Sequence, residues 1–346
     1  MGRRSALITG LAGTELNDAE AQFLKSCRPV GIILFQRNCQ SVEQIRRLIG
    51  AARSAIGDDD VLVLIDQEGG RVQRLKPPIV QDLPPAAAFG RCYADMGKEE
   101  GCAAAYAAAR LVASQLASLG INTNCTPVLD IPVPGAHDII GDRAYGATVE
   151  QVVQLGRAVI DGHLASGVVP VMKHIPGHGR AREDSHLSLP VVTTDRATLE
   201  ATDFAPFAAL AGCPAAMTAH VVYTAIDPHA PASTSPAVIG DVIRGAIGFD
   251  GMLMSDDLSM SALTGSLRAR AEAVIAAGCD VALHCNGVMA EMEAAAAGVP
   301  DLAAHAQKRA MAAFQTIAPG APFDVAAAES RLAQVFAGHT SRSESV

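Results

Sequence analysis

The sequence predicts a single (β/α)8 barrel of the α/β class, and three observations support this. Eight short aliphatic and β-branched runs recur along the 346 residues, and each precedes a loop and an alanine-rich amphipathic stretch. The runs are continuously apolar, which is typical of parallel strands buried on both faces. No linker rich in proline, glycine or serine divides the chain. Strands that alternate with helices imply right-handed crossovers, and eight such units close into a TIM barrel.

The expected elements follow one another in regular order, each strand a short apolar run and each helix an amphipathic stretch. The strands are expected at residues 6–9, 31–35, 61–66, 122–130, 168–174, 215–220, 251–255 and 280–284. The helices are expected near residues 18–26, 42–55, 102–119, 149–165, 196–211, 235–246, 263–277 and 288–297, with two more near 302–316 and 325–336. One catalytic domain over residues 1–337 and a frayed polar tail over 338–346 are therefore predicted.

An open, doubly wound sheet is the alternative fold. It would usually bring a glycine-rich phosphate-binding turn after the first strand. Gly10-Leu11-Ala12-Gly13 follows the first expected strand, and it matches such a turn only weakly. The barrel is therefore the predicted fold.

Composition and charge exclude several classes of protein. Hydrophobic residues make up 49% of the chain and charged residues 18%, which indicates a globular protein with a large core. The net charge is −9 and no long basic run occurs, so nucleic acid is not an expected partner. No run approaches the roughly 18 apolar residues of a membrane helix, so no membrane contact is expected.

The termini and cysteines bear on the compartment. Residues 1–8 (MGRRSALI) faintly resemble a signal peptide, but the apolar stretch is short and no small-x-small cleavage site follows. We interpret this segment as the start of the first strand. The eight cysteines are scattered without a C-x-x-C pair, which argues against a zinc ribbon or redox motif. Reduced thiols in apolar runs behave as small hydrophobes, so a reducing cytoplasm is predicted.

Polar residues concentrate at the predicted carboxyl ends of the strands, which is where a (β/α)8 barrel has its active site. A pocket rich in carboxylates, cations and imidazoles is the simplest interpretation. In strand order, these segments are residues 66–71 (DQEGGR), Asp130 with Asp142-Arg143, 173–179 (KHIPGHG) with 184–186 (DSH), His220, 255–257 (SDD) and 284–286 (HCN).

Several of these acidic residues also have a purely structural interpretation. Asp66 or Asp130 alone could cap the helix that follows its strand. Asp257 could cap the helix after the seventh strand while Asp256 points inward, because neighbouring side chains of a strand alternate. Both the capping and the site interpretation therefore stay open at this stage.

Lys173 and His174 are harder to explain structurally. They end an otherwise apolar strand, and burying an unpaired charge is costly. Groups of this kind cluster at functional sites. Arg71 is expected to be a surface or orienting residue. For His220 and His284, a hydrogen-bonded core position and a site position both remain open.

The combination of motifs resembles family 3 β-N-acetylglucosaminidases. KHIPGHG at 173–179, followed by DSH at 184–186, resembles the signature of that family. SDDLSM at 255–260 resembles its nucleophile segment, and DQEGGRV at 66–72 and GDR at 141–143 resemble two of its sugar-binding loops. The likeness covers about residues 5–336 and is greatest to the bacterial single-domain branch of peptidoglycan recycling.

This resemblance implies a role for each matching residue. Asp256 corresponds to the catalytic nucleophile. His186 corresponds to the general acid/base, with Asp184 as its partner. The residues that correspond to contacts with the sugar are Asp66, Arg74, Arg143, Lys173 and His174.

The resemblance also implies a reaction and a substrate. The expected enzyme is a retaining exo-β-N-acetylglucosaminidase that removes terminal non-reducing N-acetylglucosamine from muropeptides. These are peptides of N-acetylglucosaminyl-β-1,4-anhydro-N-acetylmuramic acid. A small carbohydrate is thus the expected partner, and no metal or organic cofactor is implied. The preference for N-acetylglucosamine rests on the resemblance alone, and the sequence leaves the oligomeric state open.

The residue types suit this chemistry. A retaining hydrolase needs a nucleophile on one side of the anomeric carbon and a proton donor on the other, usually two carboxylates. His186 would replace the second carboxylate, and histidine titrates near neutrality, so it can act as both acid and base. Asp184 could hold its tautomer. We expect the loop of residues 177–186 to bring His186 towards Asp256 only when a sugar is bound.

Three other functions are weighed against this one. A metal-dependent hydrolase could use His174, His178, Asp184 and His186, and sensitivity to a chelator would distinguish it. An aldolase could form a Schiff base on Lys173 while His174 and Asp256 shuttle protons, and borohydride trapping would reveal it. A binding protein on a decayed barrel would show no turnover.

Overall fold

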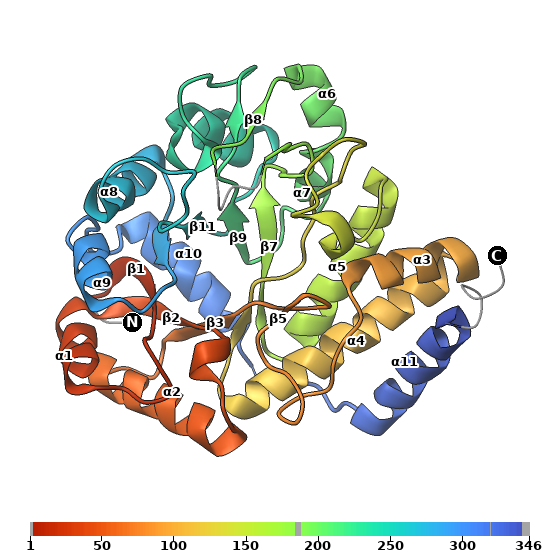
Figure 1. Cartoon of the computed structure of the whole chain (residues 1–346), viewed down its shortest axis with the longest axis horizontal. Coiled ribbons are helices and arrows are strands. Elements are labelled where there is room, and N and C mark those ends of the chain that lie inside the picture. The colour runs from red at the N-terminus through yellow and green to blue at the C-terminus, as the bar shows by residue number, and fades with distance from the viewer. Residues whose placement is uncertain (1–2, 184–187, 319, 341–346) are drawn as a thin grey trace.

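The computed structural model describes residues 3–183, 188–318 and 320–340, and it confirms the predicted barrel (Figure 1). Eight parallel strands close in the order β1-β12-β11-β9-β7-β6-β3-β2. The barrel strands are β1 (Ser5–Gly10), β2 (Pro29–Leu34), β3 (Leu62–Ile65), β6 (Thr123–Asn124), β7 (Val169–Ile175), β9 (Ala215–Thr218), β11 (Met252–Asp257) and β12 (Val281–His284).

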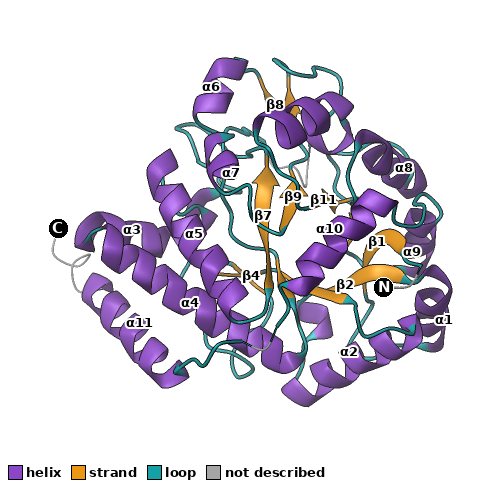
Figure 2. Cartoon of the chain, turned by 180° about the vertical axis from the view of Figure 1, so that it is seen from behind, coloured by secondary structure: helices purple, strands orange, loops and turns teal. Residues whose placement is uncertain are grey.

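Helices surround this barrel, as the view from behind also shows (Figure 2). The α-helices are α1 (Asp18–Cys27), α2 (Val42–Ile56), α3 (Ala86–Met96), α4 (Lys98–Leu119), α5 (Val149–Ala165), α6 (Arg196–Ala201), α7 (Ala205–Ala209), α8 (Leu267–Ala277), α9 (Met289–Ala296), α10 (Ala304–Gln315) and α11 (Val325–Thr340). Three short 3-10 segments are η1 (Gln36–Asn38), η2 (Gly141–Arg143) and η3 (Ala232–Thr234), and η4 (Val238–Ala246) is a π-helix.

Apolar side chains alternate between two cores along each barrel strand. In β2, Ile33 belongs to the cluster inside the barrel, whereas Ile32 packs between the barrel and the helices. In β7, Val171 likewise lies inside the barrel, and Met172 packs between the barrel and the helices. Both positions are buried, and this is why the strands read as continuously apolar runs.

The strands differ from the expected ranges mainly at the rim of the barrel. The fourth strand, expected over residues 122–130, is reduced to β6, and residues 125–130 continue as irregular chain that joins β7 through Leu129 N to Lys173 O (2.7 Å). Pro127 lies in this segment and has no N–H for a ladder. Two small sheets add to the rim: the hairpin of β4 (Gln67–Gly69) and β5 (Val72–Gln73), and the pair of β8 (Val191–Val192) and β10 (Val222–Tyr223).

The helices also differ in places. α3 was not expected, and the helix predicted over residues 196–211 is divided into α6 and α7. Pro206 stands in the first turn of α7, where proline begins a helix without loss of a hydrogen bond. α11 continues to Thr340, so residues 338–340 are helical where a frayed tail was expected. The rest of that expected tail, residues 341–346, lies outside the described residues.

One helix requires a correction to the sequence analysis. α4 is long and apolar enough to cross a membrane by length and composition. However, 61% of its apolar window is buried within the protein, and α4 packs against α3, α5 and α11. Figure 1 shows α11 lying along the outside of α4. α4 is therefore a core helix of the barrel shell, which has the same composition as a membrane span because it is covered on several sides.

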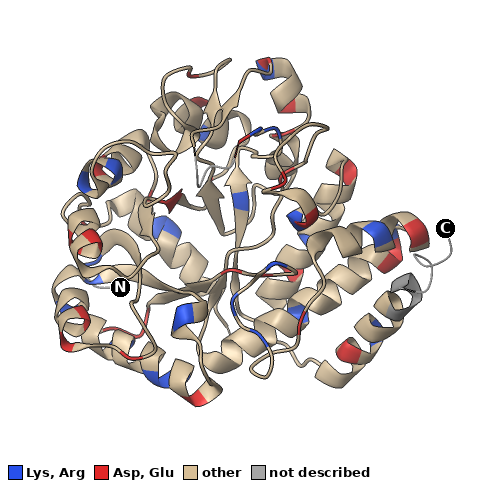
Figure 3. Ribbon diagram, viewed as in Figure 1, with Lys and Arg blue, Asp and Glu red and all other residues tan. Residues whose placement is uncertain are grey.

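The charged residues are interspersed over the helices. Figure 3 shows Lys and Arg mixed with Asp and Glu over the ribbon. Two ion pairs form within one helix, Arg196 with Glu200 and Arg268 with Glu272. This mixed pattern is typical of a solvated helical surface.

We predict that two Gly→Ala substitutions have opposite effects on stability. A Cβ at Gly162 in α5 would lie 2.7 Å from Ala109 Cβ of α4, whereas a Cβ at the exposed Gly50 in α2 meets nothing within 4 Å. Overpacking should make Gly162→Ala less stable by about 1–3 kcal/mol. Gly50→Ala should be more stable by about 0.5–1 kcal/mol, because alanine favours the helix. Urea unfolding of both variants measures the difference, and equal shifts would contradict close packing of α4 on α5.

Candidate active site

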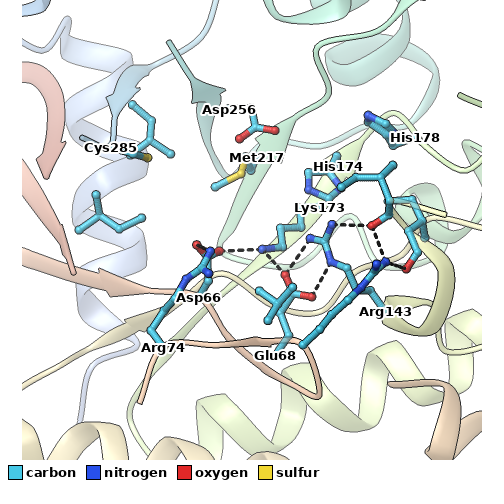
Figure 4. Close-up of a pocket in the computed structure, with 16 residues that line it drawn as sticks. Asp66, Glu68, Arg74, Arg143, Lys173, His174, His178, Met217, Asp256 and Cys285 are labelled. Atoms are coloured by element: carbon cyan, nitrogen blue, oxygen red, sulfur yellow. Dashed lines mark hydrogen bonds and ion pairs between the residues drawn. The ribbon is translucent and has the colours of Figure 1, made fainter. Parts of the chain in front are cut away.

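A cavity of about 300 Å3 opens at the carboxyl ends of the barrel strands (Figure 4). Its walls come from the ends of β2, β3, β7, β9, β11 and β12, from the β4–β5 hairpin and from residues 139–143. Asp184 and His186 lie outside the described residues. The other predicted site residues all line the cavity, namely Asp66, Arg74, Arg143, Lys173, His174 and Asp256.

Five charged side chains form a chain of alternating sign along one wall of the cavity (Figure 4). Arg74 Nη2 lies 3.2 Å from Asp66 Oδ2, and Lys173 Nζ lies 2.8 Å from Asp66 Oδ1. The same Nζ lies 2.7 Å from Glu68 Oε1. Arg143 holds Glu68 with two parallel bonds, Nη2 to Oε1 at 2.8 Å and Nε to Oε2 at 2.9 Å. The order of charges is thus Arg74, Asp66, Lys173, Glu68, Arg143, and one positive charge is in excess.

Backbone packing brings these residues together from distant parts of the sequence. Asp66 follows β3 and Lys173 lies in β7, and β6 stands between these two strands in the barrel. Because β6 ends at Asn124, the side chains of β3 and β7 meet over its end. Asn124 also fixes the start of the β4–β5 hairpin, since its side chain exchanges two hydrogen bonds with the backbone of Gln67 (2.9 and 3.0 Å).

The ion pairs set the protonation of this wall. Burial would raise the pKa of Glu68, but the charges of Lys173 and Arg143 outweigh it and lower that pKa to about 2. Burial is likewise outweighed at Asp66, whose pKa is well below its ordinary value. Burial would lower the pKa of Lys173, yet the two carboxylates raise it above the ordinary range. A Schiff-base lysine needs a neutral amine, so this arrangement counts against the aldolase.

His174 is held by a second buried carboxylate. Its Nδ1 lies 2.6 Å from Asp130 Oδ2, and its backbone N–H donates to Asp130 Oδ1 (3.2 Å). The backbone N–H of His178 donates to the same oxygen at 2.6 Å. The peptide bond between Lys173 and His174 is cis, and both side chains line the cavity. With Nδ1 bonded to Asp130, Nε2 is the His174 nitrogen left for other partners.

Asp256, near the end of β11, faces the charged wall across the cavity (Figure 4). One of its carboxylate oxygens accepts the backbone N–H of Asp257 (2.8 Å). Burial by itself would raise the pKa of Asp256, but nearby His174 and His220 outweigh it, and the pKa lies below the ordinary value of 3.8. Unlike Asp66 and Glu68, Asp256 has no ion pair within the described part of the chain. Asp256 is therefore an ionised carboxylate in the cavity wall, and no cationic side chain among the described residues pairs with it.

The neighbouring Asp257 points elsewhere. Its Oδ1 accepts from the backbone N–H groups of Ser259 and Cys285, each at 3.1 Å, and it fixes the turn after β11. Asp256 thus points into the cavity as expected, but Asp257 does not cap the next helix, because α8 begins at Leu267 and has Ser266 as its N-cap. His220 proves to be a core residue, because it is fully buried and bonded to Ser233 Oγ (2.7 Å) and Asp257 O (3.0 Å).

Arg71 orients the loop that carries Arg143. Its Nε pairs with Asp142 (3.0 Å), and its Nη2 donates to the carbonyls of Ile139 (2.9 Å) and Ile140 (3.2 Å). Gly141 has a φ of +42°, and a Cβ there would lie 2.3 Å from Asp138 Oδ1. This glycine therefore permits the tight turn before Arg143. The expectation that Arg71 is an orienting residue is consistent with these contacts, and it also lines the cavity.

Comparison with known proteins bears on what this cavity does. The sequence matches the model of the glycosyl hydrolase family 3 N terminal domain over residues 7–318. The chain belongs to glycosyl hydrolase family 3. The matched region of this family 3 enzyme includes every barrel strand except the first two residues of β1, and every described residue of the cavity.

Relatives of this family 3 enzyme have a common description. A beta-hexosaminidase of Alkalilimnicola ehrlichii is 43% identical over 284 residues, which cover 81% of this chain and 80% of the relative. A beta-hexosaminidase of Methylococcus capsulatus is 40% identical over 282 residues, with 80% and 81% covered. This enzyme is accordingly a glycoside hydrolase of the β-N-acetylhexosaminidase type, and it acts on small carbohydrates.

Solved structures agree with the fold. NagZ from Neisseria gonorrhoeae, in complex with N-trifluoroacetyl-D-glucosamine, superposes with a TM-score of 0.86 at 33% identity, covering 96% of this chain and 98% of that one. A family 3 β-N-acetylglucosaminidase from Paenibacillus superposes with a TM-score of 0.85 at 31% identity. That second alignment covers 95% of this chain and 66% of the Paenibacillus enzyme.

Sequence reasoning missed part of the cavity. Glu68 stood inside the quoted DQEGGRV motif, but no role was assigned to it, although it links two predicted contacts. Apolar and sulfur-containing liners carried no recognisable signal, because such side chains read as ordinary core residues. These liners are Ile33, Val72, Ile139, Ile140, Met217, Leu283 and Cys285.

The described residues test only part of the hypothesis of a metal-dependent hydrolase. Across residues 3–183, 188–318 and 320–340, no three His, Cys, Asp or Glu side chains are grouped as metal ligands. Two of its four candidate ligands, Asp184 and His186, lie outside these residues. The expectation that the enzyme needs no metal therefore stays a prediction, which a chelator can test.

We predict a pH-dependent loss of stability for Asp130→Asn. Burial would raise the pKa of Asp130, but His174 outweighs it and the pKa lies below the ordinary 3.8. Stability from a carboxylate with a depressed pKa is present above its unfolded pKa and is lost as the pH falls through the folded one. The variant should lose about 1.5–3 kcal/mol at pH 7, because a charged hydrogen-bond acceptor is removed. Urea unfolding at pH 7, 4 and 3 should show the deficit shrinking below pH 3.8, and a constant deficit would contradict this account.

Proposed function

We propose that this family 3 enzyme is a retaining exo-β-N-acetylglucosaminidase that removes terminal N-acetylglucosamine from muropeptides in peptidoglycan recycling. In this proposal Asp256 is the nucleophile, His186 is the general acid/base and Asp184 is the partner of His186. The observation that carries the proposal is the Asp256 carboxylate, which faces the cavity, is ionised and has no ion-pair partner among the described residues.

The size of the cavity supports an exo-acting enzyme. A volume of about 300 Å3 lies at the lower end of ligand pockets, which suits a single terminal sugar rather than a chain running through. The charged wall supplies donors and acceptors in one place. Sugar hydroxyls both donate and accept hydrogen bonds, so a wall of alternating cations and carboxylates fits them. We assign sugar binding to the wall residues and to His174; the proposed contacts are Asp66, Arg74, Arg143, Lys173 and His174.

The proposed reaction proceeds in two displacements. Asp256 Oδ attacks the anomeric carbon while His186 protonates the glycosidic oxygen, and the aglycone leaves. A covalent glycosyl-aspartate results. His186, now neutral, then removes a proton from water, and the water oxygen displaces Asp256 from the anomeric carbon. Two inversions give overall retention, and Asp256 returns to its carboxylate form. The depressed pKa of Asp256 keeps it ionised throughout the neutral range.

The substrate and the compartment are proposed from the motifs, the relatives and the cysteines. The muropeptide substrate rests on the resemblance of the motifs to the single-domain branch of the family. The relatives' names give hexosaminidase activity, and the NagZ complex contains an N-acylated glucosamine. For the predicted cytoplasm, the supporting feature is that all eight cysteines are free thiols, five of them buried.

We predict that Asp256→Asn abolishes turnover of an aryl β-N-acetylglucosaminide. The amide is neutral and a poor nucleophile, so kcat should fall by about 10⁴-fold or more. Release of nitrophenol, measured with and without a chelator, gives the rate. Unchanged wild-type activity with the chelator would exclude the metal-dependent mechanism. Activity that survives in the variant would move the nucleophile to Asp257 or to the acetamido group of the substrate.

A second variant at the same position, Asp256→Gly, can identify the face of the sugar ring that is attacked. Asp256→Gly leaves space at the anomeric carbon, and azide can then take the place of the missing carboxylate. We expect azide to restore turnover and to give the α-glycosyl azide, because azide attacks once, from the side of Asp256. A β-azide product, or rescue of wild type and variant alike, would argue against Asp256 as nucleophile.

We predict that the effect of His186→Ala depends on the leaving group. General acid catalysis contributes about 10²–10⁴-fold, and it matters most when the leaving oxygen is basic. The variant should therefore lose far more activity on a disaccharide than on a nitrophenyl or dinitrophenyl glycoside in the first displacement. Single-turnover rates on both substrates measure this. Equal losses on both would assign the proton transfer to another residue.

A further inference from the structure

Glu68 occupies the centre of the charged wall, although the proposed mechanism gives it no task. Its side chain is 6% exposed, and it contacts both Lys173 and Arg143. Oε1 accepts a hydrogen bond from Arg143 Nη2 and lies 2.7 Å from Lys173 Nζ in an ion pair, and Oε2 accepts a hydrogen bond from Arg143 Nε. Two of the roughly four acceptor sites of the carboxylate are therefore filled by Arg143, and the Lys173 ammonium group lies against the same carboxylate. Glu68 is poorly placed to grip a sugar, because its oxygens are already engaged.

The two cations that Glu68 holds retain donors for a ligand. An ammonium group has three N–H donors, and Lys173 donates one of them to Asp66 Oδ1 (2.8 Å) while its Nζ also forms an ion pair with Glu68. A guanidinium has five, and Arg143 uses two on Glu68 and one on the carbonyl of Ile139 (3.2 Å). Within the described part of the chain, Lys173 therefore keeps at least one donor for a ligand, and two donors of Arg143 make no hydrogen bond. Because the carboxylates hold the engaged donors of Lys173 and Arg143 in place, the unused donors of both groups also have a fixed direction.

We propose that Glu68 is a positioning residue for glycoside hydrolysis, because it orients the free donors of Lys173 and Arg143 towards the bound sugar. The inference rests on the proposed function, in which these two cations contact the sugar. Asp66 cannot replace Glu68, since its second oxygen is taken by Arg74 and it does not contact Arg143 in an ion pair. A single carboxylate thus links β7, through Lys173, to the loop that carries Arg143.

The substitution Glu68→Gln isolates this role. The amide has the same shape, but one oxygen becomes an NH2 donor, which cannot accept from a guanidinium or an ammonium group. Either Lys173 or one arm of Arg143 must then turn away. Lys173 still pairs with Asp66, so the wall keeps its three cations and only their orientation and one negative charge change. Binding of the sugar should weaken more than the chemical step.

A buried carboxylate at the opposite end of the barrel provides the matched control. Asp280 is also buried and also bridges two guanidiniums, Arg244 Nη2 (2.8 Å) and Arg309 Nη1 (3.1 Å). It precedes β12, far from the cavity end of that strand. Asp280→Asn should lower the thermal midpoint yet leave kcat and KM unchanged. If it does not fold, Arg309→Gln serves as the second control.

The experiment compares these variants with an aryl β-N-acetylglucosaminide as substrate and N-acetylglucosamine as competitive inhibitor. We expect Glu68→Gln to raise KM and the inhibition constant about tenfold or more, with kcat within about threefold of wild type. Glu68→Asp keeps the charge on a shorter side chain and should recover part of the loss. Unchanged KM and inhibition constant in folded Glu68→Gln would overturn the inference, whereas an inactive wild type would overturn the proposed function instead.

A double-mutant cycle tests whether Glu68 acts through Arg143. Arg143→Lys keeps the charge but loses the two-bond grip on Glu68. If Glu68 positions Arg143, the combined loss in the double variant should fall short of the product of the two single losses. Losses that simply multiply would show that Glu68 and Arg143 act independently, and this would contradict the positioning role.

Discussion

The site depends on the neutralisation of one buried cation, Lys173. An ammonium group at the end of an apolar strand is tolerated only when carboxylates surround it. Asp66 and Glu68 supply them, and each is in turn shared with an arginine, so the five charges form one connected unit. Asp66, Lys173 and Glu68 each have two partners in this unit, so each of these three charges keeps one partner when the other is removed. The wall is therefore rigid as well as polar, and both properties suit recognition of a sugar.

The wall also explains why Asp256 has no ion-pair partner among the described residues. Arg74, Lys173 and Arg143 are engaged by Asp66 and Glu68, and Asp256 remains ionised, with its pKa below the ordinary value, because His174 and His220 lie near it. In the proposed mechanism, a nucleophile tied to Lys173 or Arg143 would be stabilised and less reactive. The proposed roles thus assign sugar binding to the charged wall and nucleophilic attack to the unpaired Asp256, within a cavity of about 300 Å3.

Local irregularity of the barrel makes this arrangement possible. β6 is short, and the chain after it is irregular up to Asp130, so side chains of β3 and β7 meet over its end while Asp130 reaches His174. A regular fourth strand over residues 122–130 was predicted because the segment lies between two amphipathic helical stretches in the repeating order of strands and helices. The sequence pattern shows burial but does not show whether a segment pairs along its whole length. That depends on contacts with β7, which lies about 45 residues further on.

The sequence by itself determined the fold class, the family and most of the charged residues of the cavity. The apolar strand runs and the motifs around Asp66, Lys173 and Asp256 are local signals. They predict one shared cavity because the carboxyl ends of all the strands lie on the same face of the barrel. Tertiary structure alone decided which carboxylates are paired. Glu68 lies within a recognised motif and Asp130 at an expected strand end, but only the closure of the barrel brings them to Lys173, Arg143 and His174. Ion pairing depends on distance in space, which no local pattern of residues records.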